Sequence, residues 1–139
     1  MPAAQTILVV DDSPFAARAL VHVLESHRLV ARAASTMEDA MKICEESHPC
    51  LLVTDVRMPN IDVLDLCRRF RAAESGQAVA VLLFSAHPEH EIRDIVSLSG
   101  ADAFMEKRHG AAAVAARVQS ICTALAKQQS TQPQARAPG

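Results

Sequence analysis

Residues 7–14 read ILVVDDSP, and this stretch decides the fold prediction. An apolar run ends at two carboxylates, Asp11 and Asp12, after which Ser13 offers a helix N-cap and Pro14 the first helical position. A short, continuously apolar run of this kind favours a strand that is buried on both faces, as in a parallel sheet. The stretch therefore predicts a buried strand, a polar strand end and a helix directly after it.

The same succession of strand and helix recurs along the chain. Short apolar runs lie near residues 6–10, 29–34, 51–54, 79–84 and 102–105, and helical patterns separate them. Crossovers of this length are right-handed and place helices on both faces of the sheet. We therefore predict an α/β fold of the (βα)5 type, a doubly wound parallel sheet of five strands in the flavodoxin-like order 2-1-3-4-5, within a three-layer sandwich.

Helix boundaries also have local signals. For the second helix two capping boxes compete, Ser35 with Glu38 and Thr36 with Asp39. Gly100 is expected to end the fourth helix, because glycine adopts the left-handed conformation of a C-cap without strain.

One domain accounts for most of the chain, since 139 residues fall within the single-domain size range. We expect residues 1–127 to form it. From 128 to 139 the composition changes to Gln, Ser, Thr, Pro and Ala without apolar periodicity, which predicts a disordered tail.

Composition excludes several functional classes. A net charge of −2 gives no broad electrostatic reason to bind nucleic acid or an anionic membrane. Residues 1–5 lack a basic start and a long apolar stretch, so no leader sequence is expected, and no apolar run approaches the roughly twenty residues of a membrane span. The four cysteines form no C-x-x-C pair and are expected to be buried free thiols in a reducing cytoplasm, although His48 near Cys44 and Cys50 is a weak hint of zinc.

Polar side chains stand where the apolar runs stop. They are Asp11, Asp12, Asp55, Ser85 and Lys107. The carboxyl ends of parallel strands open on one edge of the sheet, so these residues should converge on one pocket. Two carboxylates about 4 Å apart repel by roughly 4 kcal/mol at an effective dielectric of about 20, which favours a bound cation. Magnesium suits such oxygen ligands, and a metal with an ammonium would stabilise a phosphoryl group arriving at a carboxylate.

Four stretches then show a resemblance to a known family. They are ILVVDDSP at 7–14, LLVTDVRMP at 51–59, LLFSA at 82–86 and GADAFMEK at 100–107. In this order and spacing they resemble the receiver domain of the bacterial response regulators of two-component signalling, in its single-domain form.

The resemblance implies a phosphoacceptor and a magnesium site. Asp55 would accept a phosphoryl group from a histidine kinase or a phosphotransfer protein. Asp12, Asp55 and the backbone carbonyl of Arg57 would ligate Mg²⁺, and Asp11 would act through metal-bound water. The protein would not be an enzyme beyond its own phosphorylation and dephosphorylation.

The resemblance also implies a switch. Lys107 would pair with Asp55 and then with the phosphoryl group, while Ser85 and Phe104 match the hydroxyl and aromatic switch positions. Downstream protein partners would bind the face built from the fourth helix, the fifth strand and the fifth helix. A homodimer is left open.

Three positions depart from the family pattern. One is Arg57, which stands where side chains tune water access to the acyl phosphate, and the other two keep alternatives open. Arg108 follows Lys107 where a proline preceded by a cis bond is usual, so we expect a trans bond here. Val63 replaces the usual glycine, so the loop after Asp55 is expected to take another path. One alternative is an interaction module that works without phosphorylation. Another is a magnesium-dependent phosphohydrolase of the haloacid dehalogenase type, which the absence of a D-x-D motif at Asp11 disfavours.

Overall fold

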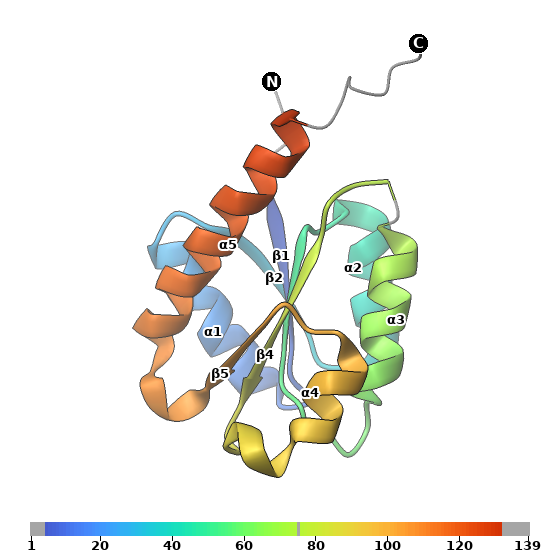
Figure 1. The fold of residues 1–139 in the computed structure, drawn as a ribbon, viewed down its shortest axis with the longest axis vertical. Helices are drawn as coiled ribbons and strands as arrows, with labels where there is room; N and C mark the ends of the chain where they lie inside the picture. The colour runs from blue at the N-terminus through green and yellow to red at the C-terminus, as the bar shows by residue number, and fades with distance from the viewer. Residues whose placement is uncertain (1–4, 75, 132–139) are drawn as a thin grey trace.

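A parallel sheet of five strands runs through the middle of the protein (Figure 1). The computed structural model describes residues 5–74 and 76–131. Its strands are β1 (Thr6–Val10), β2 (Val30–Ala34), β3 (Leu51–Thr54), β4 (Ala80–Ser85) and β5 (Ala103–Glu106). All neighbours pair in parallel, in the order 2-1-3-4-5. The predicted doubly wound topology is confirmed.

Helices cover both faces of the sheet and bury an apolar core on each side. The helices are α1 (Pro14–Ser26), α2 (Met37–Ser47), α3 (Val63–Ala73), α4 (Arg93–Ser99) and α5 (Ala111–Thr131), with short 3₁₀ turns η1 (Glu89–Glu91) and η2 (Lys107–His109). Figure 1 shows α1 and α5 on one side and α2, α3 and α4 on the other. Leu24 is fully buried in the core beneath α1 and α5, and Phe70 is fully buried in the core beneath α2, α3 and α4.

Local capping chemistry sets the helix ends that the sequence predicts. The Ser13 hydroxyl accepts a hydrogen bond from the Ala16 N–H, at 3.2 Å, and starts α1. Thr36 caps α2 by accepting the Asp39 N–H at 3.1 Å, so Thr36 rather than Ser35 is the N-cap. Gly100 ends α4 in the left-handed conformation, with φ at 66°.

Two of the three departures from the family pattern, Val63 and Arg108, lie in ordinary backbone. Val63 is the first residue of α3, which Asp62 caps, and its side chain is buried. Among the described residues, positive φ occurs outside glycine only at Arg28 and His48, so the Val63 backbone carries no left-handed strain. The described residues contain no cis peptide bond, and the expected trans bond before Arg108 is confirmed.

The last helix is longer than predicted. α5 continues to Thr131, past the domain boundary expected at residue 127, so residues 128–131 are helical and the tail prediction is wrong there. Helix propagation adds one hydrogen bond for each residue fixed, so a long helix extends readily through Gln residues, which are good helix formers. The rest of the expected tail, 132–139, lies outside the described residues.

Other sequence predictions concern cysteines and membranes. All four cysteines are buried and free, as predicted. Within 5–74 and 76–131, no helix is both long and apolar enough to cross a bilayer.

Candidate functional site

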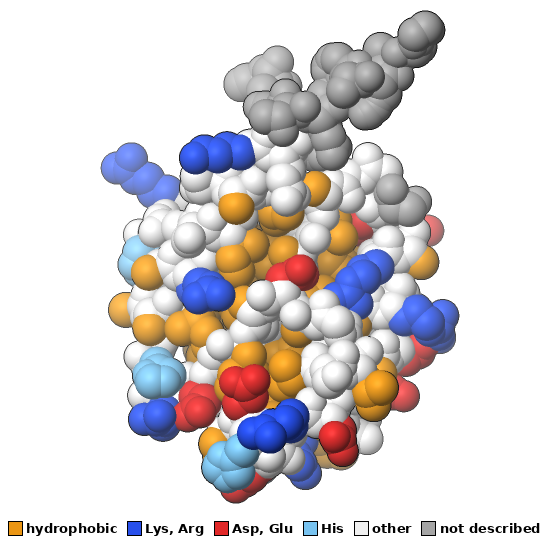
Figure 2. Space-filling model, in the orientation of Figure 1, with side chains coloured by type: hydrophobic (Ala, Val, Ile, Leu, Met, Phe, Trp, Pro, Cys, Tyr) orange, Lys and Arg blue, Asp and Glu red, His pale blue; other side chains and the backbone are white. Residues whose placement is uncertain are grey.

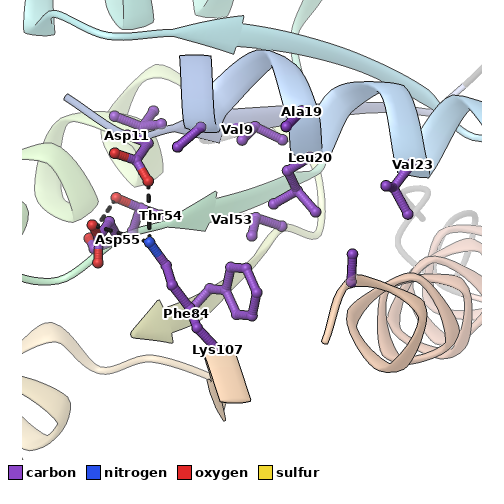
Figure 3. A pocket seen from close by; sticks show the side chains of 13 residues that line it. Val9, Asp11, Ala19, Leu20, Val23, Val53, Thr54, Asp55, Phe84 and Lys107 are labelled. Carbon is purple, nitrogen blue, oxygen red and sulfur yellow. Dashed lines mark hydrogen bonds and ion pairs between the residues drawn. The ribbon is translucent and has the colours of Figure 1, made fainter. Parts of the chain in front are cut away.

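Two neighbouring strands deliver the acidic residues to one edge of the sheet. In the parallel register of β1 and β3, Val10 lies opposite Thr54, and the next residues are Asp11 and Asp55. Lys107 follows the end of β5 and reaches across the same edge. Figure 3 shows the Asp11, Asp55 and Lys107 side chains pointing toward one another. The predicted convergence of residues distant in sequence is therefore present for these three.

One ammonium bridges two carboxylates. The Lys107 Nζ lies 3.2 Å from Asp11 Oδ2 and 3.3 Å from Asp55 Oδ2. The Lys107 side chain is 31% exposed, that of Asp11 11% and that of Asp55 17%, so the ion pairs are shielded from most of the solvent. Removing one partner of a shielded pair leaves an uncompensated charge, so each of these side chains depends on the others. Replacing the usual proline by Arg108 has not displaced Lys107 from Asp55.

Backbone groups orient both carboxylates. The Val56 N–H donates to Asp55 Oδ1 at 2.8 Å, and the Ser13 N–H donates to Asp11 Oδ1 at 3.0 Å. The Thr54 hydroxyl donates to the Asp55 backbone carbonyl at 2.8 Å. Each carboxylate therefore uses one oxygen to fix its orientation and presents the other to Lys107. Sequence reasoning missed Thr54, although a hydroxyl at the polar end of a buried strand was a usable signal.

The Phe84 ring lies beside the Lys107 ammonium on its apolar side. The Lys107 Nζ lies 5.6 Å from the centre of the Phe84 ring, within the range of cation–π attraction. Phe84 precedes Ser85, and successive strand residues point to opposite faces, so the two residues serve opposite sides of the sheet. Phe84 was not predicted to contribute, and the alternation of faces along β4 is the signal that could have found it.

A cavity of about 250 Å³ opens beside this cluster. Apolar side chains from α1 and the sheet line it, among them Leu20, Val23 and Phe84 (Figure 3). Asp55 and Lys107 are part of the same lining. The charged groups thus lie at a boundary between water and an apolar interior, where charge interactions are stronger than in bulk water.

The expected switch residues lie outside the ion-pair cluster. Ser85 ends β4, is completely buried, and its Oγ accepts the His87 N–H at 2.9 Å. Phe104 lies on β5 opposite Leu83, is half-buried and packs against the core beneath α4. The Arg57 side chain is exposed and donates to the Glu91 backbone carbonyl at 3.4 Å, which links the loop after β3 to η1.

The donor set suits magnesium by charge and ligand type. Among the described residues, no three His, Cys, Asp or Glu side chains are gathered closely enough to hold a metal between them. Magnesium does not need such a cage, because it keeps several waters and takes one or two carboxylates. Asp11 and Asp55 present two carboxylates to the single ammonium of Lys107, and Asp12 follows Asp11 directly in the chain. The remaining charge favours a hydrated divalent cation. Within residues 5–74 and 76–131, no cluster of metal-binding side chains includes His48, so the zinc hint gains no support.

Comparison with known proteins decides the family. The profile of the response regulator receiver domain matches residues 7–119. The chain belongs to the response regulator receiver family. An uncharacterized 14.6 kDa protein of Leptolyngbya boryana is 30% identical over 119 residues, which cover 86% of this chain and 91% of that protein. Membership in the receiver family favours signalling over the phosphohydrolase alternative.

Two further relatives extend the comparison. The alkaline phosphatase synthesis transcriptional regulatory protein PhoP of Bacillus subtilis is 34% identical over 116 residues, or 83% of this chain. The chain spans about half of PhoP, 47% of its length. The crystal structure of a receiver domain from Bermanella marisrubri superposes with a TM-score of 0.72 at 27% identity, covering 85% of this chain and 98% of that one. The aligned region therefore covers nearly all of the Bermanella marisrubri receiver domain.

Proposed function

We propose that this receiver accepts a phosphoryl group on Asp55 from a histidine kinase or a phosphotransfer protein, in a reaction that requires Mg²⁺. The observation that carries the proposal is the Lys107 ammonium, held 3.3 Å from Asp55 Oδ2 and 3.2 Å from Asp11 Oδ2. A carboxylate can act as a nucleophile toward phosphorus, and a fixed ammonium beside it stabilises the arriving negative charge.

The chain's own residues have separate parts in this transfer. A carboxylate oxygen of Asp55 attacks phosphorus, the bond to the donor breaks, and its electron pair leaves with the donor group. Lys107 then exchanges its contact with the Asp55 carboxylate for one with a phosphoryl oxygen. Asp12, Asp55 and the Arg57 carbonyl are the proposed ligands of Mg²⁺, with Asp11 acting through water. The bound metal would supply further positive charge to neutralise the phosphoryl oxygens.

The phosphoryl group then biases a switch. It adds about −1.5 to −2 charges and new acceptor oxygens, which would attract the Ser85 hydroxyl away from its present bond with the His87 N–H. Movement of Ser85 would leave space for the half-buried Phe104 ring. Shifting the equilibrium from 1:99 to 99:1 requires the phosphoryl contacts to favour the active state by about 5.5 kcal/mol.

The output surface is proposed to lie over α4, β5 and α5. β5 is an edge strand whose four residues are all half-buried, so this face exposes side chains that a partner would cover. Figure 2 shows hydrophobic side chains gathered in the middle of the face, between α5 and α4. Leu98 of α4 is 72% exposed. A downstream protein with a complementary apolar patch fits this surface better than nucleic acid does, because the chain's net charge is −2.

Two parts of the proposal concern the setting in which the domain works. We place it in the cytoplasm of a bacterium, where histidine kinases present their phosphoryl groups. We also propose that it acts as a single-domain regulator, supported by the Leptolyngbya boryana protein, of which the chain covers 91%. A homodimer would be compatible with the cytoplasmic setting and with a single-domain regulator.

The test is phosphorylation by a small donor. The protein is incubated with acetyl phosphate, with and without Mg²⁺, and its intact mass is measured. We expect one added phosphoryl group that requires both the metal and Asp55, so Asp55→Asn abolishes it. Asp62→Asn is the matched control, because Asn also caps helices and Asp62 is the N-cap of α3. No adduct in the folded protein, together with no binding of beryllofluoride, would instead indicate an interaction module that works without phosphorylation.

A further inference from the structure

The register of the sheet brings Phe84 beside Lys107. In the parallel pairing of β4 and β5, Phe84 lies opposite Met105, and Lys107 comes two residues after Met105. Because side chains alternate between the faces of a strand, this spacing returns the lysine to the face on which the ring lies. Figure 3 shows the ring beside the lysine stem, and the Lys107 Nζ lies 5.6 Å from the ring centre. The two side chains therefore meet through tertiary structure.

The Phe84 ring lies at a boundary and not within a packed core. It is half-buried and lines the cavity of about 250 Å³ together with Leu20 and Val23 of α1. Phe70, by contrast, is completely buried in the core on the other face of the sheet. A ring that only filled space would be expected inside such a core, where close packing gives it the most stabilising contacts. The position of Phe84 instead suits a contact with a charged group.

The two carboxylates of the acidic site are fixed more firmly than the ammonium between them. The Val56 N–H holds one oxygen of Asp55. The Ser13 N–H holds one oxygen of Asp11 in the same way. The Lys107 ammonium instead ends a flexible four-carbon stem, and its side chain is 31% exposed. In the proposed reaction it exchanges a carboxylate for a phosphoryl oxygen, so a restraint that persists must come from another group.

An aromatic face provides such a restraint without occupying the hydrogen-bond donors of the ammonium. The face carries negative partial charge and attracts a cation within about 6 Å of the ring centre. The attraction is stronger where water is excluded, and the ion pairs of Lys107 are shielded from most of the solvent. Because the ring offers no lone pair, the N–H groups of the ammonium stay available for oxygen atoms.

We propose that Phe84 is a positioning residue for phosphoryl transfer, whose ring keeps the Lys107 ammonium where negative charge develops on the group arriving at Asp55. The inference rests on the proposed function of Asp55 and adds a residue to it. Preorganised positive charge lowers the barrier to such a transfer, whereas a cation on an unrestrained stem must first be oriented. Weakening the negative face of the ring should therefore slow phosphorylation.

Fluorination of the ring tests this role directly. Each fluorine withdraws negative charge from the ring face, while the size and apolar character of the ring change little. Full-length protein is prepared with mono-, di- or trifluorinated phenylalanine at position 84 and incubated with acetyl phosphate and Mg²⁺. Intact mass, followed over time, gives the rate of phosphorylation. We expect the rate to fall with each added fluorine, by about three- to tenfold for the trifluorinated ring.

Matched variants separate this role from a structural one. Phe15 is the control, because its side chain is 81% exposed, and the same fluorinated residues there should leave the rate unchanged. Phe84→Leu removes the ring but keeps an apolar side chain, so it should be as slow as the trifluorinated protein. Phe84→Tyr keeps the ring and should remain close to the wild-type rate. A purely structural role would not distinguish the fluorinated rings from one another.

Nuclear magnetic resonance detects the contact itself without phosphorylation. The chain has three lysines, Lys42, Lys107 and Lys127, so protein with isotope-labelled lysine gives few ε-methylene signals. In the metal-free protein we expect the Lys107 signal to lie upfield, because protons over a ring face are shielded. This shift should be lost in Phe84→Leu, whereas the Lys42 signal should not move.

The rate and the resonance shift distinguish the failures. A wild-type protein that keeps the shifted Lys107 signal but gains no phosphoryl group would overturn the proposed function, and the role of Phe84 in transfer with it. Phosphorylation at one rate throughout the fluorinated series would overturn the role of Phe84 alone. An unshifted Lys107 signal in the wild-type protein would overturn the contact. The fluorinated series decides the question even if Phe84→Leu does not fold, because it keeps the shape of the ring.

Discussion

At the scale of single residues, the acidic site depends on an unequal pairing of charges. Lys107 is one ammonium between the carboxylates of Asp11 and Asp55, and the Phe84 ring supports it from the apolar side. The backbone N–H groups of Ser13 and Val56 fix the other carboxylate oxygens. These backbone contacts hold the two carboxylates without using the oxygens that face Lys107.

Replacing Lys107 tests this arrangement. Lys107→Met should lower the free energy of unfolding by about 1–3 kcal/mol in metal-free buffer, because two shielded carboxylates lose their cation. Added Mg²⁺ should recover part of the loss by offsetting the same charges. Urea denaturation followed by circular dichroism measures both effects. Arg108→Met is the control, since Arg108 pairs with Glu106 at the surface and should leave the midpoint unchanged. Equal losses in the two variants would contradict the special position of Lys107.

The buried cysteines of α2 and α3 predict a dependence on alkaline pH. Burial raises the pKa of Cys44 and Cys67 from 9.0 to about 11, so the folded state holds protons that the unfolded chain releases. Their stabilising contribution is complete below the unfolded pKa and is lost as the pH rises through the folded value. The free energy of unfolding should therefore fall between pH 9 and 11. Cys44→Val/Cys67→Val should flatten this fall in urea titrations, and an unchanged slope would contradict the burial argument.

Sequence reasoning succeeded for single residues where local chemistry decides their position. Ser13 begins α1 as predicted, because its side-chain oxygen can accept a free N–H group of the first turn. Gly100 ends α4 as predicted, because glycine adopts positive φ without strain. Phe84 was missed, because its contact with Lys107 depends on how two neighbouring strands place their ends. The alternation along β4 indicates the face on which Phe84 lies, but its contact with Lys107 depends on tertiary packing.

At the scale of elements, strands are specified more sharply than the last helix. Short apolar runs bounded by polar residues define the strands, and the strand bounds lie within one residue of the predicted runs. The end of α5 has no comparable signal. Its final turns consist of Gln, Ser and Thr, whose composition suggests a tail, yet the helix continues to Thr131. Propagation from a packed helix outweighs composition there.

The N-cap of α2 gives an element-scale prediction. Thr36→Ala removes the oxygen that accepts the Asp39 N–H and should lower the free energy of unfolding by about 1 kcal/mol. Thr36→Ser keeps the oxygen and should remain near the wild-type value in the same urea titration. If both variants lost the same amount, the lost methyl group rather than the cap would be responsible.

At the scale of the whole molecule, the doubly wound sheet gathers its acidic site at one edge. The carboxyl ends of β1 and β3 carry Asp11 and Asp55, and Lys107 follows β5 at the same edge. The topology was predictable because few arrangements bury five apolar strands with right-handed crossovers. Which side chains meet at each edge was predictable only for residues directly at strand ends.

A change of the output face should accompany activation. Beryllofluoride with Mg²⁺ mimics a phosphoryl group and should alter hydrogen exchange in α4, β5 and α5, because the proposed switch acts through Ser85 at the end of β4 and Phe104 on β5. α2, on the far edge of the molecule from β5, should keep its exchange rates. Peptide-resolved mass spectrometry measures both regions. Uniform changes over the chain, or none at all in a complex that does bind, would contradict the proposed switch.

The most direct measurement identifies the phosphorylated residue chemically. Borohydride reduces an acyl phosphate to an alcohol, so the phosphorylated protein is treated with it, digested and sequenced by mass spectrometry. We predict homoserine in place of Asp55, only in the sample that received both acetyl phosphate and Mg²⁺. Homoserine at Asp11 or Asp12 instead, or an added phosphoryl mass with unmodified Asp55, would contradict the account.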